Sequence, residues 1–255
     1  MTADAPVERE QSPDRFNTTQ WSVVLACADS GTGQKEAHAA LTELCRIYWR
    51  PIFAFISRRG FSTQDAQDLT QDFFVMILEG HLLKRTDPSR GRFRTLLLKA
   101  LDNFLTSDYR KRHARKRGGD VQIVSWDDWM AEAPSRLSIP STQVDQWPAE
   151  RIYDVRWAAT VVERALRRLA EECQARGRRR VFDVLSSTLA SEREDVSYTS
   201  LGKTLGVSET TVKRLVHQLR QRHRALLREE VARTVESMAE IDDEVRYLCA
   251  ALAAM

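Results

Sequence analysis

The sequence predicts an all-α protein made of two helical domains joined by an irregular linker. Apolar residues recur at steps of three and four through several long segments, which is the spacing of one helix face. All 7 prolines lie at or before Pro148, and proline costs about 3 kcal/mol inside a helix, so the segment after it can be continuously helical. Only residues 121–126 have the composition of a strand.

Composition excludes several classes of protein. At 255 residues the chain suffices for one large or two small domains, and 42% hydrophobic residues exclude global disorder. The net charge is only +3, so a polyanionic partner must be inferred from where the charges lie. No apolar run approaches the ~20 residues of a membrane span, and the polar N-terminus lacks the pattern of a secretory signal. We therefore expect a cytoplasmic protein without membrane insertion.

The cysteines give no sign of a metal site. None of the 4 forms a CxxC pair, and none lies at a zinc-finger interval from a histidine. We therefore expect reduced thiols and no metal. We also expect no cofactor and no catalytic residues.

Breaks in the helical pattern divide the chain. Residues 118–148 combine two adjacent glycines with three prolines and three tryptophans, the composition of an irregular linker. The tryptophans are expected to pack against the chain's own domains or against a partner. The expected segments are an N-terminal extension over 1–34, a first helical domain over 35–117, the linker over 118–149, a second helical domain over 150–233 and an acidic C-terminal tail over 234–255.

The first domain contains an acidic helix. Ser62 followed by Asp65 forms a capping box, which predicts a helix that starts near residue 62. Its apolar stripe comprises Ala66, Leu69, Phe73, Met76 and Ile77. Asp65, Asp68 and Asp72 stand on one flank of the helix. A solvated charged face is the ordinary explanation, and the alternative is that these carboxylates, with Gln71 beside them, dock onto a basic partner.

The next segment has the opposite charge. Residues 92–117 hold nine basic side chains against Asp102 and Asp108, and six of the nine lie in 110–117. Phe104 and Tyr109 lie close to this run, and basic residues interleaved with aromatic ones suit a surface that binds phosphates and stacks on bases. The alternative is a basic helix end that complements its own dipole.

A helix-turn-helix motif is predicted over about 197–227. Ser197 is expected to cap a short first helix, Gly206 to form the turn and Ser208 to cap the second helix. The second helix carries six lysines or arginines and no acid between Thr210 and Arg228, which favours DNA binding over a simple packing hairpin. The candidate DNA contacts are Ser208, Thr210, Thr211, Lys213, Arg214, His217, Gln218 and Arg220.

Residues 65–74 (DAQDLTQDFF) and 91–97 (GRFRTLL), followed by a basic helix, resemble region two of the extracytoplasmic-function (ECF) sigma factors. The resemblance implies that the loop over 81–92 captures flipped bases of the melted minus-ten element and that Asn103 contacts a base. The implied polymerase contacts are Asp65, Asp68, Gln71 and Asp72. The implied minus-ten contacts are Arg92, Phe93, Arg94, Asn103, Tyr109, Arg110, Lys111 and Arg112. Members of the family often have Trp where this chain has Leu96.

Residues 197–213 resemble region four of the same family, which reads the minus-thirty-five element, and the two matches occur in the family's order. The resemblance implies a sigma factor that recruits bacterial core RNA polymerase to specific promoters and is not an enzyme. Its implied partners are core RNA polymerase, promoter DNA, and an anti-sigma factor or other regulator. Residues 16–28 and 153–169 resemble a subgroup with extended termini.

Two other functions remain open. An autonomous helix-turn-helix regulator would not depend on polymerase. It would have no use for the acidic stripe formed by Asp65, Asp68 and Asp72. A DNA-processing enzyme such as a recombinase would need a nucleophile or metal-binding carboxylates in an α/β domain, and the sequence shows neither. The acidic tail is expected to form a helix that either completes the core of the second domain or masks its DNA-binding surface.

Overall fold

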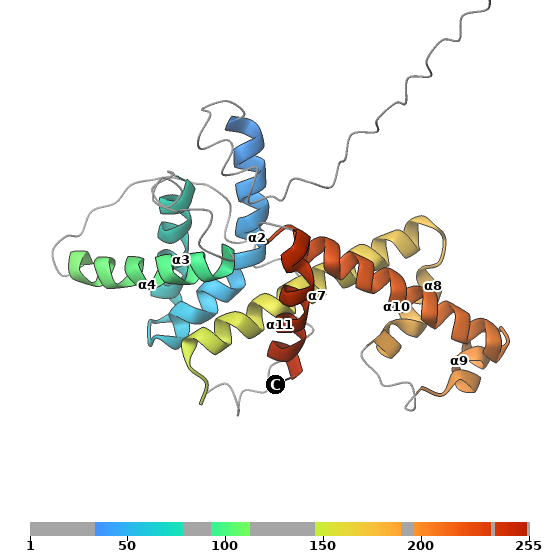
Figure 1. Cartoon of the computed structure of the whole chain (residues 1–255). Coiled ribbons are helices and arrows are strands. Elements are labelled where there is room, and N and C mark those ends of the chain that lie inside the picture. The colour runs from blue at the N-terminus through green and yellow to red at the C-terminus, as the bar shows by residue number, and fades with distance from the viewer. Residues whose placement is uncertain (1–33, 79–92, 113–145, 190–195, 236–237, 254–255) are drawn as a thin grey trace, which may run out of the picture.

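The computed structural model describes residues 34–78, 93–112, 146–189, 196–235 and 238–253. Within these ranges the chain is helical and has no strand, which confirms the predicted class. The strand-like residues 121–126 lie outside them. The helices are α2 (Gln34–Arg58), α3 (Thr63–Leu78), α4 (Phe93–Arg112), α7 (Ala149–Ala175), α8 (Arg179–Leu185), η3 (Ser186–Leu189), α9 (Tyr198–Leu205), α10 (Glu209–Ala232), η4 (Met238–Glu240) and α11 (Ile241–Ala253). Figure 1 shows α2, α3 and α4 at one end and α8 and α9 at the other, with α7 and α10 between them.

The first hydrophobic core lies among α2, α3 and α4. α2 continues through Pro51, which is buried, as are Trp49 and Ile52 of the core. The predicted apolar stripe of α3 faces this core, with Met76 half-buried and its other four members buried. Tyr48 of α2 packs edge-on against Phe93 of α4, with ring centroids 5.2 Å apart. The periodicity read from the sequence therefore identified the buried face of α3 correctly.

α7 connects the first core to a second one. Tyr153, Trp157 and Val161 of its first half are buried in the first core. Ala165 and Leu169 of its second half are buried in the second core, with side chains of α8 and α10. These positions follow at steps of four, and each such step turns the stripe by about 40° because a helix has 3.6 residues per turn. The buried stripe thus winds around α7 as it passes from one core to the other.

The first turns of α7 lie in the segment 150–233 that the sequence analysis assigned to the second domain, yet they contribute to the first core. Trp147, just before α7, is the linker tryptophan that falls within the described residues. It is buried with Ile152 and Val155, and its carbonyl oxygen accepts a hydrogen bond of 2.7 Å from Nε of Arg58. Trp147 therefore packs against its own chain, and the two cores share a continuous helix.

The acidic tail forms α11, which packs on the first core. Ile241 and Leu248 of α11 are buried there, together with Val231 and Val235 near the end of α10. In Figure 1, α11 lies against α7 and the C-terminal end of α10. The predicted helix is present. It packs on α7 and α10, the long helices of the predicted second domain, while its buried residues belong to the first core.

Candidate nucleic-acid interface

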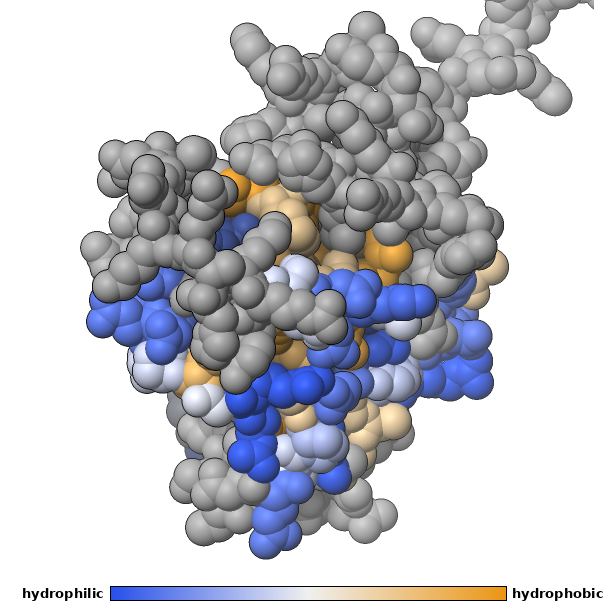
Figure 2. Space-filling view, turned by 90° about the vertical axis from the view of Figure 1, so that its left-hand side faces the viewer, coloured by the Kyte–Doolittle hydropathy of each residue, from blue (hydrophilic) through white to orange (hydrophobic). Residues whose placement is uncertain are grey.

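The acidic stripe of α3 lies at the surface. Asp65, Asp68, Gln71 and Asp72 are all exposed, whereas the opposite side of the helix is buried in the first core. The predicted capping box is also present: Oγ of Ser62 accepts from the backbone N–H of Asp65 at 3.1 Å and donates to Oδ2 of Asp65 at 2.7 Å. Asp65 therefore helps to start the helix in addition to contributing to the acidic stripe. Figure 2 shows this end of the molecule, where hydrophilic side chains cover much of the coloured surface.

The start of α4 is buried, which corrects the expectation that Phe93 and Arg94 contact DNA. Phe93 is 2% exposed and belongs to the first core. The guanidinium of Arg94 donates to Oε1 of Glu244 and Oδ1 of Asp154, each at 2.7 Å, and lies 3.8 Å from the ring centroid of Tyr247. Burial lowers the pKa of Arg94, but the two carboxylates outweigh burial and raise it above its ordinary value. Both side chains anchor α4 in the core.

The outer face of α4 is polar. Thr95, Lys99, Asn103 and Thr106 are exposed and follow one another at steps of three and four, so they share one side of the helix. Asn103 thus lies at the surface, on the same side as Thr95 and Lys99, which are not among the predicted contacts. Leu96, where the family often has Trp, is half-buried against the first core. The predicted contacts whose side chains lie outside the described residues are Arg92, Tyr109, Arg110, Lys111 and Arg112, together with the loop over 81–92.

α9 and α10 form the predicted helix-turn-helix. Gly206, between the two helices, has a φ of 71°, in the left-handed region that favours glycine. A Cβ on Gly202 would lie 2.8 Å from a backbone carbonyl oxygen of the turn, so the turn packs closely on α9 only with glycine there. Ser208 caps α10 as predicted, accepting from the backbone N–H of Thr211 at 3.2 Å. Ser197 precedes α9 without a side-chain capping bond, contrary to the prediction.

The outer face of α10 presents most of the predicted DNA contacts. Those that are exposed are Ser208, Thr210, Lys213, Arg214, His217 and Gln218, and Thr211 is half-buried. Glu209, which the sequence analysis did not select, accepts from Nζ of Lys213 at 2.7 Å and from Oγ1 of Thr199 at 2.9 Å, and these two bonds lower its pKa. Nζ of Lys213 also lies 5.4 Å from the ring centroid of Tyr198. The i, i+4 spacing of Glu209 and Lys213 was the sequence signal that could have found this pair.

Arg220 holds α10 to the element before the motif. Its Nε and Nη2 both donate to the carbonyl oxygen of Thr188 in η3, at 3.2 and 2.6 Å, and the side chain is half-buried. The side chain is not fully buried, so the expectation that Arg220 also contacts DNA stays a prediction. Its role in this structure is to fix the position of α10.

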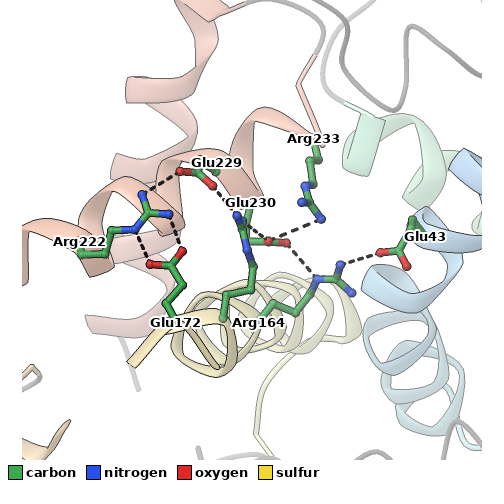
Figure 3. Close-up of polar contacts among 8 residues, drawn as sticks. Glu43, Arg164, Glu172, Arg222, Glu229, Glu230 and Arg233 are labelled. Carbon is green, nitrogen blue, oxygen red and sulfur yellow. Dashed lines mark hydrogen bonds and ion pairs between the residues drawn. The ribbon is translucent and has the colours of Figure 1, made fainter. Parts of the chain in front are cut away.

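An ionic cluster joins α10 to α7 and α2 (Figure 3). Glu230 of α10, which is 1% exposed, accepts from Nε of Arg164 at 3.0 Å and from Nη1 of Arg168 at 2.8 Å. Arg164 also donates to Oε2 of Glu43 in α2 at 2.7 Å. Burial raises the pKa of Glu230, but the surrounding arginines, Arg233 first, outweigh burial and lower it. The remaining members of the cluster are Glu172, Arg222 and Glu229. The cluster ties the orientation of α10 to the first core.

Two further findings concern the described segments as a whole. None of their helices is long and apolar enough to cross a membrane. No three of their His, Cys, Asp or Glu side chains are placed to hold a metal ion.

A comparison with protein-family models assigns the chain to a family. A model described as "ECF sigma factor" matches residues 53–229, a range that includes α3, α4 and the helix-turn-helix. Comparisons with curated proteins and with solved structures gave no significant match. Because the matched range spans more than half of the chain, the chain belongs to the ECF sigma factor family, a family of non-enzymatic transcription factors, and has the role of a sigma factor in transcription initiation.

Proposed function

We propose that the chain recruits core RNA polymerase through α3 and directs it to particular promoters through α4 and α10. The observation that carries the proposal is the division of α3 into two faces. The inner face is buried in the first core, whereas the flank of Asp65, Asp68, Gln71 and Asp72 is exposed. A row of carboxylates held on a rigid helix offers a complementary surface to a basic partner.

α4 is the proposed contact to the melted minus-ten element. Its exposed face combines the ammonium of Lys99, which can bind a phosphate, with the amide of Asn103, which can donate to and accept from a base edge. Phe93 and Arg94 anchor the start of the helix in the core, so these exposed groups are presented from a fixed backbone. The buried arginine thus supports DNA recognition from within the protein.

α10 is the proposed recognition helix for the minus-thirty-five element. Its first turns expose Lys213, Arg214, His217 and Gln218, whose donors suit base edges and phosphates in the major groove. The capping bond of Ser208 and the contact of Arg220 with η3 fix the helix on which these side chains stand. Lys213 is held by Glu209, and this exposed pair can open when a phosphate competes for the ammonium.

An autonomous helix-turn-helix regulator is the second candidate function. The exposed donors of α10 would serve such a protein equally well. It would leave the acidic flank of α3 without a role, and the family match extends over α3 and α4 as well as over the helix-turn-helix.

In vitro transcription with core polymerase on a pool of genomic fragments tests the proposal. We expect transcripts from a small subset of fragments only when the chain is added. Arg214→Ala should reduce these transcripts, whereas Arg246→Gln, a matched loss of one exposed arginine on α11, should not. Fragments that bind the chain but give no chain-dependent transcript would favour the autonomous regulator.

A further inference from the structure

A basic cluster lies at the junction of α7 and α8, outside the motif that the sequence analysis selected. Its members are Arg176, Arg178, Arg179 and Arg180, all exposed. Gly177 has a φ of 66° and makes the sharp turn between the two helices. Four of the five consecutive residues 176–180 are therefore arginines, and they lie at a tight turn.

Neighbouring carboxylates only partly neutralise this cluster. Nε of Arg179 donates to Asp183 at 2.9 Å. Arg176 approaches Glu172 only to 3.9 Å, and Glu172 already accepts two hydrogen bonds from Arg222. A net positive charge therefore remains at the turn.

The four positive charges do not stabilise the turn itself. Arg179 and Arg180 stand in the first turn of α8, where the positive end of the helix dipole disfavours cations. Four like charges so close together also repel one another. An anionic partner outside the chain would remove this repulsion.

Arg180 places the cluster beside the helix-turn-helix. Its Nη2 donates to the carbonyl oxygen of Thr204, near the end of α9, at 3.0 Å. Only Leu205 to Val207 separate Thr204 from the Ser208 cap of α10. In helix-turn-helix complexes the first helix of the motif crosses the DNA backbone while the start of the second helix enters the major groove. The cluster therefore borders the path that the DNA backbone would follow.

We propose that the basic cluster binds phosphates of the DNA duplex beside the site read by α10. The cluster would add affinity without base specificity, because phosphate contacts are independent of sequence. The proposal rests on the DNA-binding role proposed above for α10, but not on polymerase binding.

The test measures binding of the full-length chain to a fluorescent duplex of mixed sequence, without polymerase, from about 50 to about 200 mM salt. The test variant carries Arg176→Gln, Arg178→Gln and Arg179→Gln, and it keeps Arg180 because that side chain supports α9. The control variant loses the same charge elsewhere, through Arg46→Gln, Arg228→Gln and Arg246→Gln. These three arginines are exposed and paired with Glu43, Asp242 and Asp243. Unchanged far-ultraviolet circular dichroism shows that each variant is folded.

The test variant should bind the duplex more weakly, with a slope of log K against log salt shallower by about 0.9 for each phosphate that the variant no longer binds. The control variant should keep the slope of the unaltered chain. Equal slopes and affinities for all three proteins would overturn the proposal, as would no duplex binding by the unaltered chain at about 50 mM salt.

Co-purification with core polymerase separates this proposal from the proposed function. The test variant should still co-purify, because the cluster is assigned to DNA. Loss of co-purification with an unchanged salt slope would make the cluster a protein contact and overturn the proposal. If the unaltered chain itself fails to co-purify, the proposed function fails, while the salt slopes still decide the role of the cluster.

Discussion

Arg94 and Glu244 lie 150 positions apart in the chain, yet Nε of Arg94 donates to Oε1 of Glu244 at 2.7 Å. The first residue is in α4, whose outer face is the proposed minus-ten contact, and the second is in the C-terminal helix α11. Arg94 also donates to Asp154 of α7. One buried guanidinium therefore connects three helices, and the acidic tail is part of the structure that supports α4.

Replacing Glu244 should destabilise the fold. Glu244→Gln keeps the shape of the side chain but leaves the Arg94 guanidinium with Asp154 as its remaining carboxylate partner. We expect a loss of about 3 kcal/mol in the free energy of unfolding, measured by urea denaturation, because one of the two carboxylates that compensate the buried guanidinium is lost. Asp243→Asn, which removes an exposed carboxylate paired with Arg246, should cost less than about 1 kcal/mol. Equal losses for the two variants would contradict the role assigned to Glu244.

Deleting residues 236–255 should lower the melting temperature rather than increase DNA binding. The deletion removes the buried Ile241 and Leu248, each of which stabilises the fold by about 1.5–3 kcal/mol on burial. The tail contacts α10 near its C-terminal end, where Arg228 pairs with Asp242, far from the exposed residues of the first turns. A truncated chain with an unchanged melting temperature and a higher affinity for duplex DNA would instead support the idea that the tail masks the recognition helix.

The ionic cluster around Glu230 should make stability depend on pH in the acid range. The arginines hold the native pKa of Glu230 below its ordinary value of about 4.5. Its stabilising effect is therefore complete above about pH 4.5 and is lost as the pH falls through the lower native pKa. Glu230→Gln should cost about 3 kcal/mol at neutral pH, and the difference from the unaltered chain should shrink below about pH 4.5. Urea denaturation across this range measures the effect, and a difference that is independent of pH would contradict it.

Arg214 and Arg220 should separate DNA contact from structural support within α10. Arg214→Ala should weaken binding to promoter duplex by about 1–3 kcal/mol if the arginine reads a base, with little change in melting temperature, because the side chain is exposed. Arg220→Ala should lower the melting temperature, because it removes both hydrogen bonds to Thr188. Fluorescence anisotropy and thermal denaturation of both variants measure the two effects. Matching profiles for the two variants would show that the distinction is wrong.

Local patterns in the sequence were sufficient to predict the helical class, the buried face of α3 and the turn and cap of the helix-turn-helix. Each of these depends on residues within a few positions of one another, as with Ser208 and Thr211. The roles of Arg94 and Arg220 could not be predicted in this way. Both belong to basic segments, but their partners lie 150 and 32 positions away. Charge density alone does not distinguish an arginine that contacts DNA from one that a distant acceptor holds inside the fold.

Binding of core RNA polymerase by variants of α3 tests the central claim most directly. The variant carries Asp68→Lys and Asp72→Lys and keeps Asp65, because Asp65 also caps the helix with Ser62. The control reverses two exposed acids elsewhere, through Glu171→Lys and Asp183→Lys. With both variants as helical as the unaltered chain, the account predicts that the α3 variant no longer co-purifies with core polymerase while the control does. Co-purification of the α3 variant at the level of the unaltered chain would contradict the account.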